Sequence, residues 1–218
     1  MKIRNLAEQP SLASQYMAEL RDVDLQTDRM RFRHNLNRLG QIMAYEVSKE
    51  IAFSRTDVTT PLGTAHCDVV GEPVVVATIL RAGLPLHEGV LSFFDNAENA
   101  FVSAYRKYRP GSDEFDIHIE YLASPSLDGK TLILTDPMLA TGASMELAYK
   151  ALLTKGTPKH VHVLSVIASQ KAVDFVAKTL PSESTTLWIA AIDPDLNAHS
   201  YIVPGLGDAG DLAFGEKL

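Results

Sequence analysis

TLILTDPMLATGAS, residues 131–144, passes from an apolar run through a polar loop into the start of a helical pattern. The run does not alternate with polar residues, which is typical of a parallel strand buried on both faces. Asp136 follows the run, and Thr141, Gly142 and Ser144 precede the helix. The first amides of a helix lack internal partners and lie at the positive end of its dipole, so the loop predicts a site for a phosphate monoester. The alternative is an ordinary strand end in which Ser144 caps the helix.

Short apolar runs and helical patterns alternate along the chain from residue 74 onward. The predicted strands are Val74–Leu80, Thr131–Thr135, Val161–Ile167 and Leu187–Ile192. The predicted helices are Leu84–Phe94, Ser144–Lys155 and Lys171–Thr179. This alternation predicts an α/β fold with a central, mostly parallel sheet flanked by helices. Ligands of such sheets bind beyond the carboxyl ends of the strands, so the loops there are the candidate sites.

The first third of the chain has a different pattern. Between Phe32 and Val47, apolar residues recur at steps of three and four, which predicts one buried helix face. Asp57–Cys67 alternates around Pro61-Leu62-Gly63, which predicts a β-hairpin. The expected organisation is a single domain, residues 1–218, made of a helical arm and hairpin (1–70) and an α/β core with a C-terminal segment (71–218).

Composition limits the class of protein. A chain of 218 residues can bury a sizeable core, and its net charge of −7 argues against a general nucleic-acid binder, which needs clustered Lys and Arg. No apolar run approaches the ~20 residues of a membrane span, and no apolar stretch typical of a signal peptide follows Met1–Arg4. Cys67 is the single cysteine, so no intrachain disulfide can form. We therefore expect a cytoplasmic protein without a membrane partner.

The run Asp136-Pro-Met-Leu-Ala-Thr-Gly142 is similar to the motif that binds phosphoribosyl pyrophosphate (PRPP) in the uracil phosphoribosyltransferases, a branch of the type I phosphoribosyltransferase family. The resemblance implies the type I fold and PRPP contacts from nine consecutive residues: Asp136, Pro137, Met138, Leu139, Ala140, Thr141, Gly142, Ala143 and Ser144. Asp136 would accept hydrogen bonds from ribose hydroxyls. This branch usually has a second Gly where Ala143 stands, and the extra methyl group matters if that position needs a positive φ.

A second segment, Ile79-Leu-Arg-Ala-Gly-Leu84, resembles the pyrophosphate loop of the same family. The resemblance implies that Arg81 binds the diphosphate of PRPP through fork-like hydrogen bonds. Judged alone, an Arg at a strand end is as well explained by a salt bridge. Residues 85–90 read Pro-Leu-His-Glu-Gly-Val where the family usually has Gly-Met-Met-Asp-Gly-Val.

A third segment begins at Tyr105-Arg106 and continues through polar residues to Asp113. The resemblance matches Arg106 to an Arg on a mobile loop that closes over PRPP. Arg109 is a near neighbour and the alternative ligand. Without the resemblance, a solvated hairpin loop is the simpler interpretation.

The fourth segment, Tyr201-Ile-Val-Pro-Gly-Leu-Gly-Asp-Ala-Gly-Asp211, is nearly identical to the uracil-binding segment of the family and is the most specific motif in the chain. The resemblance implies uracil contacts from Ile202, Gly207, Asp208 and Ala209, and a further PRPP contact from Asp208. The family continues with Arg or Lys where this chain has Leu212, so one charge is missing.

The activity implied by these resemblances is transfer of the phosphoribosyl group of PRPP to uracil, giving UMP and pyrophosphate in pyrimidine salvage. The catalytic residues would be Arg81, Arg106 and Asp208. Mg²⁺ would be bound mainly through PRPP, without a set of protein ligands of its own. The family implies a homodimer or larger homo-oligomer, and it leaves activation by GTP open. We expect the apolar face of the Phe32–Val47 helix to contribute to the dimer surface.

Three alternatives stay open at this point. A regulator that senses pyrimidine nucleotides and binds RNA on the same fold would need a basic face. The same reaction on another base would need a different C-terminal segment. A catalytically silent subunit would not be expected to keep Arg81, Asp136, Thr141 and Asp208.

Two further patterns bear on the interior. His160 and His162 alternate within a predicted strand, with no Cys or carboxylate at ligand spacing, so the sequence does not predict a zinc site. Trp188 lies in the last predicted strand and is expected to pack in the core.

Overall fold

A central sheet of eight strands organises the described part of the chain. The computed structural model describes residues 1–108 and 115–217, and the side chains of this part outside residues 104–118. Across the sheet the strands are β1 (Lys2–Asn5), β10 (Thr185–Asp193), β9 (His160–Ser169), β7 (Thr131–Thr135), β4 (Val74–Leu80), β5 (Glu98–Tyr108) and β6 (Phe115–Ala123), and the short β8 (Met138–Leu139) also pairs with β9. All neighbours are parallel except β5 and β6. The predicted mostly parallel α/β sheet is confirmed.

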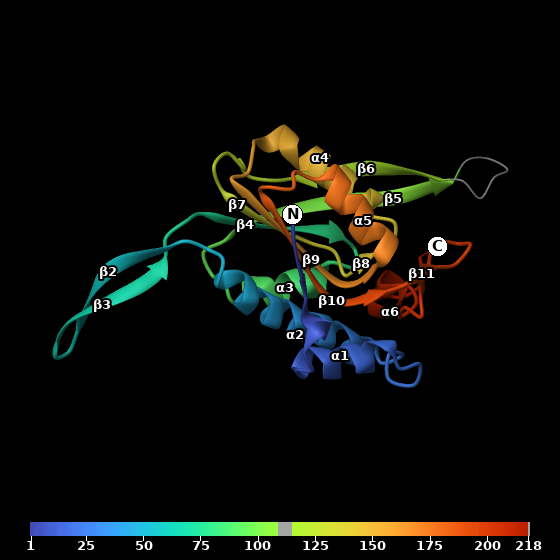
Figure 1. Ribbon diagram of the computed structural model, residues 1–218, viewed down its shortest axis with the longest axis horizontal. Coiled ribbons are helices and arrows are strands. Elements are labelled where there is room, and N and C mark those ends of the chain that lie inside the picture. Colours follow the sequence, from blue (N-terminus) through green and yellow to red (C-terminus); the bar gives the residue numbers. More distant parts are fainter. Residues whose placement is uncertain (109–114, 218) are drawn as a thin grey trace.

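Helices cover both faces of the sheet (Figure 1). One face carries α1 (Leu12–Arg21), α2 (Arg29–Ser48) and α3 (Leu84–Leu91). The other carries α4 (Ala143–Leu152) and α5 (Gln170–Thr179). Two short 3₁₀ turns span Leu6–Glu8 and Leu153–Lys155, a small sheet joins β11 (Asp195–Leu196) to β12 (Ile202–Val203), and α6 (Ala209–Phe214) follows. No helix in the described residues is long and apolar enough to cross a membrane.

The four predicted strands and three predicted helices are all present, with shifts at their ends. The helix predicted over Leu84–Phe94 ends at Leu91, and a turn follows in which the amides of Phe93 and Phe94 both donate to the Val90 carbonyl. Gly156 ends the segment after α4 with a φ of 123°, as expected of a glycine stop. β1, β5, β6 and the short β8 of this sheet were not predicted.

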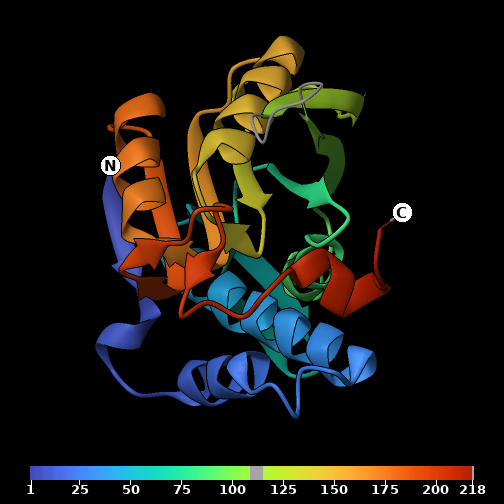
Figure 2. The ribbon, with the colours of Figure 1, turned by 90° about the vertical axis from the view of Figure 1, so that its right-hand side faces the viewer.

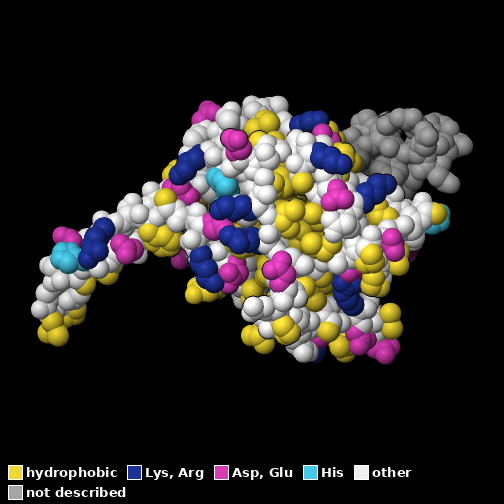
Figure 3. All heavy atoms as spheres, in the orientation of Figure 1, with side chains coloured by type: hydrophobic (Ala, Val, Ile, Leu, Met, Phe, Trp, Pro, Cys, Tyr) yellow, Lys and Arg dark blue, Asp and Glu magenta, His cyan; other side chains and the backbone are white. Residues whose placement is uncertain are grey.

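The predicted hairpin is β2 (Phe53–Thr60) with β3 (Gly63–Val70), and it extends away from the body of the molecule (Figures 1 and 3). Across its strands, Oδ1 of Asp57 and Nδ1 of His66 lie 2.5 Å apart. The predicted helices of the N-terminal third are also present. They pack against the sheet, and β1 joins the sheet beside β10.

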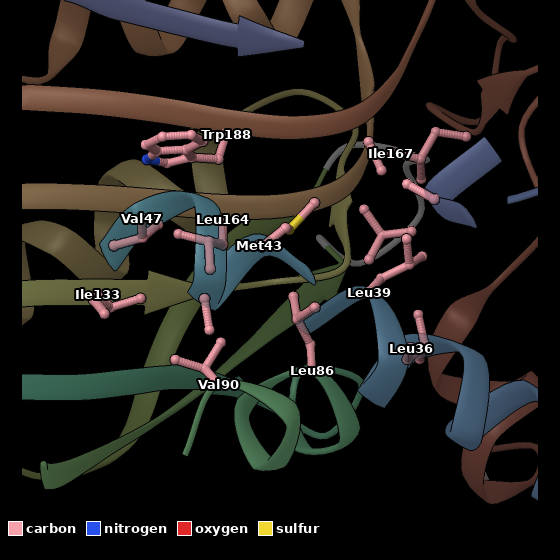
Figure 4. Close-up of a cluster of buried hydrophobic side chains, with 14 of the residues drawn as sticks. Leu36, Leu39, Met43, Val47, Leu86, Val90, Ile133, Leu164, Ile167 and Trp188 are labelled. Atoms are coloured by element: carbon pink, nitrogen blue, oxygen red, sulfur yellow. The ribbon is translucent and has the colours of Figure 1, made fainter. Parts of the chain in front are cut away.

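The apolar face of α2 lies inside the molecule. Asp28 caps this helix by accepting from the amides of Met30 and Arg31. Figure 4 shows Leu36, Leu39, Met43 and Val47 pointing toward α3 and the sheet, and all four are fully buried. The prediction that this face forms dimer surface is therefore wrong, because the chain's own sheet and α3 already cover it.

Two glycines let α2 and α3 approach closely. A Cβ on Gly40 would lie 2.4 Å from the Leu86 carbonyl oxygen, and one on Gly89 would lie 2.1 Å from the Asn37 carbonyl oxygen. Both contacts are with backbone atoms, which cannot move aside cheaply. The close packing fixes α3, and therefore the loop that enters it after β4.

A buried histidine makes the stability of this core sensitive to pH. Trp188 is buried as predicted, and its indole N–H donates to Nδ1 of His162 at 3.1 Å. An indole is only a donor, so this Nδ1 must be unprotonated. Burial, and then the neighbouring His160, lower the pKa of His162 from 6.5 to about 4.

We expect the free energy of unfolding to fall by about 2 kcal/mol between pH 7 and pH 5 because of His162. The unfolded chain takes up this proton near pH 6.5 and the folded chain only near pH 4, so the contribution is complete above pH 6.5 and is lost as the pH falls toward 4. In His162→Asn the side-chain carbonyl can still accept from Trp188. Urea unfolding of this variant should show a fall in the free energy of unfolding between pH 7 and pH 5 that is about 2 kcal/mol smaller than in wild type. The exposed His199→Asn serves as the control, and an unchanged pH dependence in His162→Asn would contradict the assignment.

Candidate functional site

Three segments meet at the carboxyl ends of the parallel strands. They are the loop after β4, the loop between β7 and α4, and the C-terminal segment that leads into α6. The amide of Ala209 donates to Sδ of Met138 at 3.3 Å, which joins the second segment to the third. Nη2 of Arg81 lies 3.4 Å from Oδ1 of Asp211 and 3.3 Å from the Gly215 carbonyl oxygen, which joins the first to the third. Figure 2 shows α6, in red, beside α3 and α2.

The loop between β7 and α4 is held by its backbone. The Pro137 carbonyl accepts from the amides of Val166 and Ile167, and Ser169 donates its hydroxyl to the Ala140 carbonyl at 2.6 Å. Both contacts come from β9, the neighbouring strand. The loop is therefore fixed before any ligand arrives, which favours tight positioning.

Gly142 begins α4. It is the N-cap residue with a φ of 84°, so Ser144 is not the cap that the alternative interpretation expected. Ala143 lies inside the helix and is not among the residues of positive φ in the described chain, so its methyl group is accommodated. The N-cap Gly142 has no side chain to cap α4, so the first amides of the helix, apart from the Ala143 amide that donates to Oγ1 of Thr141, can meet an anion.

Burial divides the nine predicted loop residues into two groups. Pro137, Leu139 and Gly142 are buried and position the loop. The remaining six are partly exposed and able to face a ligand: Asp136, Met138, Ala140, Thr141, Ala143 and Ser144. Within the loop, Oγ1 of Thr141 accepts from the Ala143 amide at 3.4 Å.

Asp136 has an unusual charge state. Surrounding protein raises the pKa of its carboxyl to about 7, the Met138 amide lowers it, and the carboxylate of Asp208 raises it further. The acid after β7 and the acid before α6 therefore lie near enough to each other to interact electrostatically. A carboxyl with a pKa near 7 loses its proton more readily when a bound ligand brings hydrogen-bond donors or a cation.

The C-terminal segment presents its backbone. Gly205 and Gly207 have φ values of 66° and 91°, which favour glycine. Oδ1 of Asp208 accepts from the amides of Gly210 and Asp211 at 2.8 and 3.1 Å and so caps α6. Ile202 and Ala209 are buried, so any ligand contact at Ile202 involves its backbone.

Arg81 lies on the surface beside α6, within reach of Asp211. Arg106 lies in β5, but its side chain falls outside the described part of the chain, as does Arg109 altogether. Which of these two arginines serves a ligand stays a prediction. The loop that holds Arg109 is likewise outside the described residues.

Comparisons with known proteins find relatives along nearly the whole chain. The family model described as uracil phosphoribosyltransferase matches residues 7–216. A uracil phosphoribosyltransferase of Porphyromonas gingivalis is 61% identical over 218 residues, which cover 100% of both chains. One of Pyrobaculum arsenaticum is 42% identical over 205 residues, covering 93% of this chain and 94% of its own.

The chain belongs to the uracil phosphoribosyltransferase family.

The structure of the AQ2163 protein from Aquifex aeolicus is also similar, with a TM-score of 0.86, 30% identity and 98% of each chain covered. The type I phosphoribosyltransferase fold expected of a uracil phosphoribosyltransferase is confirmed.

Three departures from the uracil phosphoribosyltransferase pattern follow Leu84 and lie at the start of α3. Pro85 occupies the first turn of α3, where its missing amide costs no hydrogen bond. Leu86 is fully buried in the core. His87 is also buried, with Nε2 2.8 Å from Oδ1 of Asn99. All three residues are buried.

Sequence reasoning missed Arg21 and Asp193, which contact the C-terminal segment at Gly205. Neither residue lies in a recognised motif. They are 172 positions apart, so no local pattern could have paired them.

Proposed function

We propose that this chain transfers the phosphoribosyl group of PRPP to uracil, giving UMP and pyrophosphate in pyrimidine salvage. One observation carries the proposal: the contact between Met138 and Ala209 places the phosphate-type loop directly beside the segment that matches the family's uracil site. The two substrates of a transfer reaction must meet in one place. Family membership supports the same reaction.

In this proposal the loop before α4 holds the 5′-phosphate. The first amides of α4 and the hydroxyls of Thr141 and Ser144 are the donors. Asp136 accepts from the ribose hydroxyls. Arg81 meets the diphosphate, and Arg106 is assigned a similar role through the family motif.

Catalysis then rests on positioning and on charge. Uracil N1 attacks C1 of the ribose as the diphosphate departs, and C1 develops cationic character. Arg81 stabilises the leaving group. Asp208 directly precedes Ala209, whose amide contacts Met138, and it is the candidate for electrostatic stabilisation of C1 or for accepting the uracil proton.

Mg²⁺ is part of the proposal. Among the described residues no three His, Cys, Asp or Glu side chains come together as a metal site. Oxygens of PRPP would supply most of its ligands, and Asp136 and Asp208 are the acidic side chains of the proposed site. When bound, Mg²⁺ would neutralise charge on the diphosphate.

Asp136→Asn is expected to have two effects of opposite sign. It should weaken PRPP binding by about 1–3 kcal/mol at pH 8, because the charged acceptor for the ribose hydroxyls is lost. It should raise the free energy of unfolding at pH 8 by up to about 4 kcal/mol, because the folded state holds this carboxyl at a pKa of about 7 instead of 3.8. In wild type, the destabilisation of the folded state by this raised pKa is absent below pH 3.8 and grows as the pH rises toward 7.

Calorimetric titration with PRPP and urea unfolding measure the two effects. The exposed Asp95→Asn is the control and should change neither. Wild-type PRPP affinity in Asp136→Asn would remove Asp136 from the proposed site.

We further propose a cytoplasmic homodimer or larger homo-oligomer, as the family pattern implies. Its interface would not use the apolar face of α2, which is buried within the chain. GTP is the candidate effector that the family pattern suggests.

The experiment for the proposed function is a panel of bases incubated with PRPP and Mg²⁺ while pyrophosphate release is followed. Uracil should release pyrophosphate and yield UMP in equal amounts. Release with a purine base and not with uracil would contradict the proposal. RNA binding without UMP formation would favour the regulator instead.

A further inference from the structure

A closed hydrogen-bonded network fixes the backbone of Gly205 in the C-terminal segment. Arg21, the last residue of α1, donates from Nη2 to Oδ1 of Asp193 at 2.6 Å and from Nη1 to Oδ2 at 2.8 Å. The same Nη1 donates to the Gly205 carbonyl at 2.9 Å. The Gly205 amide donates to Oδ2 of Asp193 at 2.8 Å. Both polar groups of one peptide residue are therefore held by one ion pair.

The ion pair is well shielded from solvent. The side chains of Arg21 and Asp193 are 26% and 6% exposed. Burial opposes the charge of Asp193, but the hydrogen bonds from Arg21 and the Gly205 amide outweigh it and lower the pKa of this carboxyl. The pair therefore stays charged at neutral pH, and a bidentate charged contact of this kind is both strong and directional.

The held residue has little freedom of its own to move. Gly205 has a φ of 66°, and a Cβ there would lie 2.0 Å from the Ile202 carbonyl oxygen. Gly207 follows two positions later, and a Cβ there would lie 3.8 Å from Oε1 of Gln26. Nε2 of Gln26 donates to the Arg21 carbonyl at 3.1 Å. Arg21 at the end of α1 and Gln26 after it therefore pack against the C-terminal segment.

We propose that Arg21 and Asp193 are positioning residues for the pyrimidine base. The inference rests on the proposed function and adds to it: the ion pair orients the backbone of residues 205–209, and that backbone reads the base. Its effect is specific to the base. In the part of the chain that the structure describes, the hydrogen bonds of the two side chains reach each other and Gly205, and none reaches Arg81 or residues 136–144.

Arg21→Lys and Asp193→Asn test the proposal. A lysine ammonium cannot bridge two carboxylate oxygens and a carbonyl in the planar arrangement of a guanidinium. Asparagine keeps the shape of Asp193 but loses its charge. We expect the KM for uracil to rise roughly 10- to 100-fold in each variant, while the dissociation constant for PRPP changes less than about twofold.

Arg31→Lys is the matched control. Arg31 donates from Nε to Oε2 of Glu19 at 3.0 Å, so it also joins the end regions of α1 and α2 through a carboxylate, away from Gly205. The KM for uracil of the Arg31→Lys variant should stay at the wild-type value. An unchanged KM for uracil in Arg21→Lys and Asp193→Asn, or an equal loss of uracil and PRPP binding, would overturn the proposal.

Amide hydrogen exchange separates this inference from the proposed function. Peptides covering residues 202–211 should exchange faster in Arg21→Lys and Asp193→Asn than in wild type and Arg31→Lys. If wild type forms no UMP, the proposed function fails, and exchange still reports whether the ion pair holds the segment. If wild type forms UMP and exchange is unchanged in the two variants, the positioning role fails by itself.

Discussion

Cytosine is expected to react with PRPP at least about 1,000-fold less efficiently than uracil, measured as kcat/KM. Across O2, N3 and position 4, uracil presents acceptor, donor and acceptor, whereas cytosine presents acceptor, acceptor and donor. The segment at residues 202–209 offers backbone groups whose directions depend on the positive φ values of Gly205 and Gly207. A fixed amide or carbonyl cannot exchange donor for acceptor. Cytosine would leave two buried groups facing like partners, at about 1–3 kcal/mol each.

A competition assay with uracil, cytosine and 5-fluorouracil measures this discrimination. 5-Fluorouracil keeps the polar edge of uracil and should remain a substrate, which makes it the control for general effects of ring substitution. Comparable kcat/KM for uracil and cytosine would exclude recognition by fixed backbone groups.

Gly142→Ala is expected to lower the affinity for PRPP by about 100-fold. Its φ of 84° disfavours any side chain, and a Cβ would lie 2.7 Å from Cδ1 of Phe175 and 3.2 Å from Cγ2 of Val176. The start of α4 would have to move away from α5. The donors that meet the phosphate in the proposed function would move with it.

Gly129→Ala is the matched control, because Gly129 also has a positive φ, 69°, but no atom lies within 4 Å of the position of a Cβ. We expect it to cost about 1 kcal/mol of stability and to leave PRPP affinity unchanged. Isothermal titration with PRPP and thermal unfolding distinguish the two variants. Equal PRPP affinities in Gly142→Ala and wild type would show that the α4 amides do not hold the phosphate.

The strands that could be predicted are those that lie deepest. β4, β7, β9 and β10 are buried along nearly their whole length, so almost every residue contributes to an apolar signal. β1 lies at an edge and reads Lys-Ile-Arg-Asn, so its place depends on backbone pairing with β10 and not on side-chain type. The strand was therefore invisible to a pattern of hydrophobicity.

The loops of the site could be predicted for a related reason: each is a continuous motif. The contacts between them could not. Met138 and Ala209 are 71 positions apart, and Arg21 and Asp193 are 172 apart, so only the fold brings them together. The apolar face of α2 was assigned to a dimer surface because a buried stripe has the same sequence pattern whether its own sheet or a partner covers it.

A crystal structure with bound UMP would test the assembled site most directly. The account predicts the phosphate within about 2.7–3.2 Å of the amides at residues 141–144, and the polar edge of uracil on the backbone of residues 202–209. Asp136 should lie within hydrogen-bond distance of the ribose hydroxyls. A phosphate bound away from the start of α4, or a base that does not touch residues 202–209, would contradict the account.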